Sequence, residues 1–138
     1  MREISLYSFG WRVLARQYRG LFDLRQGVTD MIPHYRWADM VVTSSGLSRY
    51  ESAACGAPAL FCALYPAHVA PSEAFVQAGI ARYIGLCDQL SGAYWRREIN
   101  ALADDPAARR TLSRTGQKMI DGNGMDRLLQ ALKKELVQ

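Results

Sequence analysis

The fold is decided by one stretch of sequence, ADMVVTSSGLSRYESAACGAP, which runs from Ala38 to Pro58. Within it, Met40 to Thr43 is a short run that is apolar at first, as is typical of a strand covered on both faces in a parallel sheet. The small polar residues Ser44-Ser45-Gly46 follow and predict a loop. A helix is then predicted over Arg49–Ala54.

The start and the end of this helix both carry local signals. Ser48 suits the N-cap position and Glu51 follows three residues later, which is the Ser-x-x-Glu pattern of a capping box. Gly56 accepts the left-handed conformation beyond a last turn, and Pro58 cannot continue a helix. Ala59–Leu64 is the next buried strand, so the segment is predicted to be a strand-loop-helix-strand unit.

The same alternation extends on both sides of this unit. Towards the C-terminus we predict a helix over Ser72–Ala78, a strand over Ala81–Ile84, a helix over Ser91–Ala103, a helix opening at Asp105-Pro106 and a terminal amphipathic helix over Met125–Val137 that packs back on the domain. Towards the N-terminus we predict a strand over Ile4–Ser8, a helix from Trp11 to Leu21, short strands near Phe22 and Val28, and a turn or helix over Asp30–Trp37. This order predicts an α/β fold, a Rossmann-like three-layer domain with a mainly parallel sheet.

Length and composition limit what the chain does. Its 138 residues suffice for one domain over 1–138 but not for two, and 49% hydrophobic and 22% charged residues are ordinary for a globular protein. No apolar run approaches the roughly 18 residues of a membrane span, and Met1 to Gly10 lacks the features of a secretory signal, so we expect a cytoplasmic protein. Cys55, Cys62 and Cys87 lack disulfide-framework or zinc spacing, so we expect reduced thiols and no metal site.

Charge favours an anionic substrate over a nucleic acid. The chain has 17 basic and 13 acidic residues, for a net charge of +4. The basic residues are dispersed and no nucleic-acid motif accompanies them, so nucleic-acid binding is not expected. Arg12, Arg16 and Arg19, beside aromatic residues, could contact an anionic membrane or a partner domain. The favoured interpretation is that the apolar residues there pack on the sheet while the arginines face water.

The loop after the first strand is the best candidate for a ligand site. Ligands of open parallel sheets bind beyond the carboxyl ends of the strands, and the small-residue loop from Thr43 to Ser48 leaves such an end and enters a helix. Free backbone N–H groups at a helix start favour an anion, Gly46 permits close approach, and the serines add hydroxyl donors. The loop is neither a Walker loop nor a Gly-x-Gly-x-x-Gly motif. Glu51 either caps its own helix or accepts both hydroxyls of a ribose, and its spacing alone favours the cap.

The stretch Ala38–Pro58 resembles the C-terminal domain of family 28 glycosyltransferases and their relatives, which are built from two Rossmann-like domains in the arrangement called GT-B. The family pattern has Ala-Asp, an apolar strand, a small-residue Gly loop, a Glu in the next helix and Gly-x-Pro before the next strand, and this sequence matches each element. Ile120–Arg127 is similar to the Asp-Gly-x-Gly-x-x-Arg ending of the UDP-sugar hydrolases of pseudaminic acid synthesis and of related polysaccharide proteins. Ile4–Gly10 resembles the Ser-Phe-Gly strand that begins this domain in those hydrolases.

The resemblance implies particular site residues. Glu51 would hold the ribose of a uridine nucleotide, and Ser45, Gly46, Leu47 and Ser48 would lie along its diphosphate. Ser44 begins the predicted cradle, which runs from Ser44 to Glu51. Family members usually carry His-Gln and then Asn-Ala after the second strand, where they hold the sugar. Here Val69 follows His68, and the stretch up to Glu73 has neither Gln nor Asn. His68 and Glu73 are therefore candidate sugar contacts, with a loop histidine and a first-turn helix acid as the ordinary alternatives.

The implied function is a UDP-sugar-binding domain of a glycosyltransferase or UDP-sugar hydrolase in cell-surface polysaccharide or glycan biosynthesis. Such a domain is half of an enzyme, and a second domain or an N-terminal-half GT-B partner protein would supply the catalytic base. No catalytic residue, metal ligand or cofactor is assigned within this chain. The alternative is a non-catalytic nucleotide-binding or interaction module that keeps the fold.

Overall fold

Three parallel strands form the centre of the molecule in the order β1-β2-β3. The computed structural model describes residue 25 and residues 27–136, so the predicted strand over 4–8, the helix over 11–21, the strand near residue 22 and the arginines at 12, 16 and 19 lie outside the described residues. The described elements are α2 (Ile32–Trp37), β1 (Val41–Ser44), α3 (Ser48–Ala54), β2 (Ala59–Ala63), η1 (Pro66–His68), α4 (Val69–Gln77), β3 (Ala81–Leu86), η2 (Cys87–Gln89), α5 (Gly92–Ala103), α6 (Pro106–Met119) and α7 (Gly124–Leu136).

The central strand β2 explains why the sequence of this region is uniformly apolar. It pairs with β1 from Val41 opposite Ala59 onwards, and with β3 from Ala59 opposite Ala81 onwards. Both of its edges and both of its faces are covered, and every one of its residues is buried. The prediction of an α/β fold with a parallel sheet flanked by helices is therefore confirmed.

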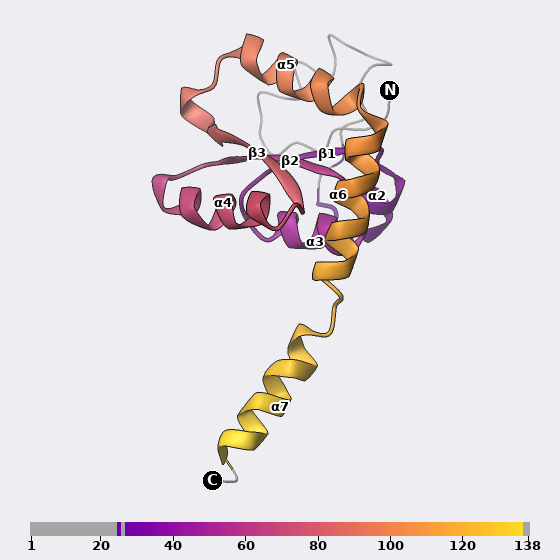
Figure 1. Cartoon of the computed structure of the whole chain (residues 1–138), viewed down its shortest axis with the longest axis vertical. Coiled ribbons are helices and arrows are strands. Elements are labelled where there is room, and N and C mark those ends of the chain that lie inside the picture. The colour runs from indigo at the N-terminus through magenta and orange to yellow at the C-terminus, as the bar shows by residue number, and fades with distance from the viewer. Residues whose placement is uncertain (1–24, 26, 137–138) are drawn as a thin grey trace.

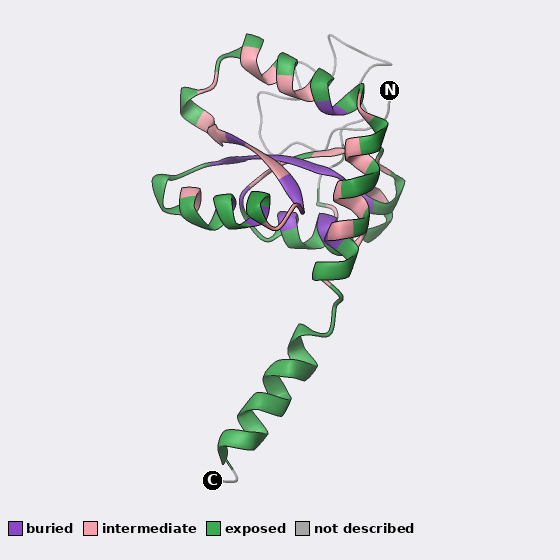
Figure 2. Cartoon of the chain, in the orientation of Figure 1, coloured by how far each residue is buried: buried purple, intermediate pink, exposed green. Residues whose placement is uncertain are grey.

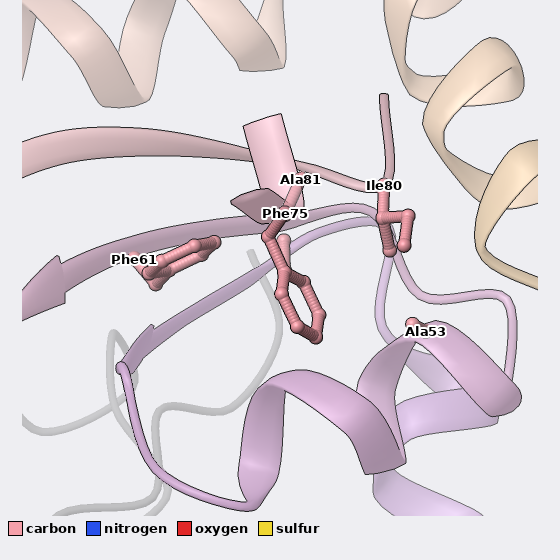
Figure 3. Close-up of a cluster of buried hydrophobic side chains, with 6 residues drawn as sticks. Ala53, Phe61, Phe75, Ile80 and Ala81 are labelled. Atoms are coloured by element: carbon pink, nitrogen blue, oxygen red, sulfur yellow. The ribbon is translucent and has the colours of Figure 1, made fainter. Parts of the chain in front are cut away.

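Side chains of β2 alternate between two hydrophobic cores, one on each face of the sheet. Ala59 and Phe61 join a cluster with Ala53 of α3 and Phe75 of α4 (Figure 3). On the other face, Leu60 and Cys62 join Ile84 of β3 and Leu102 of α5, with further apolar side chains packed around them. Figure 1 shows the corresponding layers, with α5 on one side of the sheet and α3 and α4 on the other.

Helix α6 crosses α3 at a short distance. Gly116 is buried, and a Cβ placed on it would lie 3.2 Å from the carbonyl oxygen of Ala53. A large side chain at Gly116 would therefore push the two helices apart. The crossing holds α3, which follows the candidate ligand loop, against the rest of the domain.

Two local predictions are corrected. Val28 is not in a strand, because Gly27 adopts a φ of +68° and Asp30 then accepts a hydrogen bond from the backbone N–H of Ile32 at 2.9 Å, which turns the chain into α2. Helix α4 begins at Val69 rather than Ser72, because the chain enters it directly from η1.

The terminal helix is present, but the prediction that it packs back on the domain is wrong. All described residues of α7 are exposed, and the helix projects away from the sheet (Figures 1 and 2). The physical reason is that α3, α4, α5 and α6 already cover the two faces of the sheet. No helix within residues 27–136 has the length and apolar content needed to cross a membrane.

Candidate functional site

The carboxyl ends of β1 and β2 lie side by side and carry two of the predicted site residues. Ser45 follows β1, and its backbone N–H donates to the carbonyl of Cys62 at 2.9 Å. His68 ends η1, the turn that follows β2. The Oγ of Ser45 and the Nδ1 of His68 lie 3.0 Å apart, within hydrogen-bond distance. The two loops are thus joined at the edge of the sheet where ligands of parallel α/β folds bind.

Several further contacts hold His68 in place, two through its backbone and one through its ring. The Ser72 hydroxyl donates to the carbonyl of His68 at 2.5 Å, and the backbone N–H of His68 donates to the carbonyl of Tyr65 at 2.9 Å. The Tyr65 ring meets the imidazole edge-on, with ring centroids 5.5 Å apart. Ser45 is 3% exposed whereas His68 is half-buried. Because Nδ1 is engaged by Ser45, Nε2 is the ring nitrogen left for a ligand.

Glu51 does not cap its helix, so that prediction is wrong. Leu47 occupies the N-cap position with φ −62° and ψ −28°, and no side chain caps the helix start. Ser48 is consequently the first helical residue, which places Glu51 one residue beyond the position that a capping box needs. The Glu51 carboxylate is exposed and accepts a hydrogen bond from the Tyr35 hydroxyl at 3.0 Å instead.

Tyr35 is a site neighbour that the sequence did not reveal. It is the buried residue of α2, and burial raises the pKa of its hydroxyl, with the bond to Glu51 adding to the effect and the nearby Ser48 hydroxyl opposing it. Sixteen positions separate Tyr35 from Glu51. No local spacing signal connects residues that far apart, so only the folded chain shows the pair.

Arg49 is a second residue that the sequence analysis missed. Its side chain is 8% exposed, and its guanidinium lies 4.6 Å from the ring centroid of Phe75 on α4 and 5.1 Å from that of Tyr50. Its Nε and Nη1 are buried without a hydrogen-bond partner. The guanidinium is stabilised by its contacts with the two aromatic rings, and the contact with Phe75 ties α3 to α4.

The remaining predicted residues occupy different surroundings. Ser44 is the last residue of β1 and is partly buried. Gly46 and Leu47 form the exposed turn into α3. Glu73 is exposed on α4, and its charge contributes, after burial, to the raised pKa of Tyr83 on β3. The structure thus joins Ser45 with His68 and Tyr35 with Glu51, and it leaves Glu73 exposed on α4.

The described residues offer no cluster of three or more His, Cys, Asp and Glu side chains that could hold a metal ion. Cys55, Cys62 and Cys87 are free thiols. Burial, with a smaller contribution from Cys87, raises the pKa of Cys62 to about 12, so this thiol is protonated at neutral pH. Cys62 belongs to the core and has no thiolate chemistry to offer the site.

Comparison with known proteins relates the chain to a curated glycosyltransferase. No protein-family model matches the chain, and no solved structure matches it significantly. The chain is similar to a curated protein of Geobacter sulfurreducens, UDP-N-acetylglucosamine--N-acetylmuramyl-(pentapeptide) pyrophosphoryl-undecaprenol N-acetylglucosamine transferase, with 31% identity over 98 residues. The matched region covers 67% of this chain and 26% of that enzyme. The similarity therefore relates this α/β domain to part of a glycosyltransferase.

Proposed function

We propose that the chain is the UDP-sugar-binding domain of a glycosyltransferase in glycan or cell-surface polysaccharide biosynthesis. The observation that carries this proposal is the contact between Ser45 and His68, which joins the carboxyl ends of two adjacent parallel strands. The relative named above is, by its name, a transferase of N-acetylglucosamine from a UDP-sugar. This likeness is the reason to propose transfer rather than hydrolysis.

Each part of the nucleotide has a matching group in the proposed site. The diphosphate would lie along the turn from Ser45 to Ser48, where hydroxyl and backbone donors are available. Glu51 would accept the ribose hydroxyls. A carboxylate has about four lone-pair sites, so it can accept from Tyr35 and from a ribose diol together. His68 would face the sugar through Nε2.

A second domain or chain would complete the enzyme. This chain corresponds to 26% of the relative it matches, and we propose that a partner equivalent to the N-terminal half of a GT-B enzyme supplies the catalytic base. Binding accelerates a reaction only when it favours the transition state over the bound substrate, so the isolated chain should bind a UDP-sugar without turning it over. The free thiols of the described residues suit a cytoplasmic protein.

Titration of UDP and UDP-N-acetylglucosamine into the isotope-labelled full chain, followed by amide chemical shifts, tests the proposal. We expect shifts at Ser45 to Glu51 and at His68 by roughly millimolar ligand. Glu51→Ala should abolish these shifts. It also removes the acceptor of the Tyr35 hydrogen bond, so we expect a stability loss of about 1 kcal/mol, which leaves the chain folded.

Asp39→Ala provides the matched control. Asp39 is also an exposed carboxylate, but it precedes β1 and lies at the amino end of the sheet. Its removal should leave the titration unchanged. Absence of any shift near Ser45 to Glu51 would overturn the proposal and would favour the non-catalytic interaction module.

A further inference from the structure

The positive charge of the chain is concentrated at its C-terminal end. Residues 106–138 contain seven of the 17 basic residues and three of the 13 acidic ones. The ten basic and ten acidic residues of the remaining sequence cancel, so the whole net charge of +4 belongs to this segment. Basic residues occur all along the chain, but outside residues 106–138 they do not, taken together, outnumber the acidic residues.

Helix α6 carries part of this excess on one face. Arg110, Arg114 and Lys118 recur every four residues and are exposed. Residues at that spacing lie one above the other on a helix. The helix contains no acidic residue between Pro106 and Met119. These three side chains form the basic face of α6.

Helix α7 carries an apolar face that is exposed in the described structure. Five large apolar side chains recur at spacings of three and four residues, namely Met125, Leu128, Leu129, Leu132 and Leu136. Their exposed fractions run from 47% to 84%, and Figure 2 shows the whole helix as exposed. We call this set the leucine face. Gln130, Ala131 and Lys134 lie on the other side of the helix by the same periodicity.

The start of α7 is held without help from the domain. The Asp121 carboxylate accepts hydrogen bonds from both terminal nitrogens of Arg127, at 2.8 and 3.0 Å, and one from the backbone N–H of Asn123 at 3.0 Å. This arrangement fixes the linker to the first turn. The helix therefore presents its leucine face as a formed surface.

We propose that α7 lies in the surface of an anionic lipid bilayer, with the leucine face among the acyl chains and with Lys133, Lys134 and the basic face of α6 at the headgroups. A helix of 13 residues is about 20 Å long, which is too short to cross the roughly 30 Å of a hydrocarbon core, so it lies in the plane of the surface. Apolar burial and attraction of lysines to anionic lipids act together in such helices.

The leucine face of α7 and the basic face of α6 together favour an anionic bilayer over other partners. A nucleic acid would use the basic residues but has no place for five large apolar side chains. A second protein chain would bury the leucine face but gives no reason for the charge excess to reside in the same segment. An anionic bilayer accounts for both features.

Co-sedimentation of the full chain with vesicles tests the proposal. Binding to vesicles of phosphatidylcholine mixed with phosphatidylglycerol should be at least about tenfold tighter than to phosphatidylcholine alone. High salt should weaken it, since salt screens exposed charges. Replacement of Arg110, Arg114 and Lys118 by glutamine should reduce the preference for the anionic vesicles.

A pair of matched double variants separates a lipid-binding face from a general charge effect. Leu129→Glu with Leu132→Glu should abolish vesicle binding, whereas Gln130→Glu with Ala131→Glu adds the same charge on the other side and should retain most of it. Both pairs lie on exposed α7, so the melting temperature of the domain should stay unchanged and misfolding would not explain a loss.

Three results would overturn the proposal. One is equal binding to neutral and anionic vesicles, and another is equal loss in the two double variants. The third is a failure of the unmodified chain to bind anionic vesicles while light scattering shows a dimer that Leu129→Glu with Leu132→Glu dissociates, which would assign the leucine face to a second copy. None of these results depends on the proposed nucleotide site.

Discussion

The hydroxyl of Ser45 meets the Nδ1 of His68 at 3.0 Å although 23 positions separate the two residues. Ser45→Ala removes this bond, and its net contribution predicts a loss of about 1 kcal/mol in the free energy of unfolding. The imidazole nitrogen resonances of His68 should move as well, because Nδ1 loses its partner. Denaturant unfolding and nitrogen NMR of the ring measure the two effects. Ser44→Ala, one residue earlier, should leave the His68 ring unchanged, and equal ring shifts in both variants would contradict the assignment.

The bond from Tyr35 to Glu51 should couple the two residues energetically. Tyr35→Phe removes only the hydroxyl, and we expect a loss of about 1 kcal/mol in stability together with weaker nucleotide binding, because the carboxylate is no longer held. A double-mutant cycle with Glu51→Gln isolates the pair, since the two losses should not add. Strict additivity in thermal unfolding would mean that the bond contributes nothing.

These two contacts show where sequence reasoning reached its limit. The strand β2 and the helix end at Gly56 were predictable, because an apolar run and the conformation of a glycine act over a few residues. The contacts of Ser45 and Tyr35 depend on which strands and helices become neighbours, and nothing local encodes that.

The errors at the two helices have a similar origin. The predicted N-cap at Ser48 was wrong by one residue, because Leu47 already has a helical backbone conformation. A leucine side chain gives no signal of that conformation in the sequence. The spacing of the leucines in α7 predicted an apolar face that packs on another surface. Periodicity does not show whether that surface belongs to the same domain. The location of the candidate loop beyond β1 was predictable, because it follows from a rule of fold topology.

The crossing of α3 and α6 should be destabilised by a large side chain at Gly116. Gly116→Leu would force atoms against the backbone of Ala53, which would lie 3.2 to 3.3 Å from the new Cβ, and overpacking of this kind costs about 1 to 3 kcal/mol. Gly92→Leu is the matched control, since nothing lies within 4 Å of a Cβ at Gly92. Its stability should change by no more than about 0.5 kcal/mol. Chemical denaturation compares the two, and an equal effect would contradict the close crossing.

Cys62 should resist thiol reagents in the folded chain. Burial is the chief reason that its pKa rises to about 12, and the thiolate is the reactive form. A raised pKa stabilises the folded state fully below the ordinary thiol value of about 8.5, and this contribution declines as the pH rises from there towards 12. Alkylation at pH 8 followed by mass spectrometry should label half-buried Cys55 before Cys62, and denaturant should remove the difference. Equal rates in the folded chain would show that Cys62 is not buried.

The ion pair between Asp121 and Arg127 should make the start of α7 sensitive to acid. The Arg127 guanidinium, followed by the backbone N–H of Asn123, holds the pKa of Asp121 well below its usual range. A lowered pKa means that the stabilisation is present above the ordinary aspartate value of about 3.9 and is lost as the pH falls below it. Amide shifts of Gly124 to Leu128 should report fraying there, and Asp121→Asn should cause it at neutral pH, whereas Asp126→Asn lacks this bond and should not. Because α7 is fully exposed and separate from both cores, the unfolding midpoint of the domain should be the same in all three proteins; a shift in Asp121→Asn would mean that α7 is packed on the domain after all.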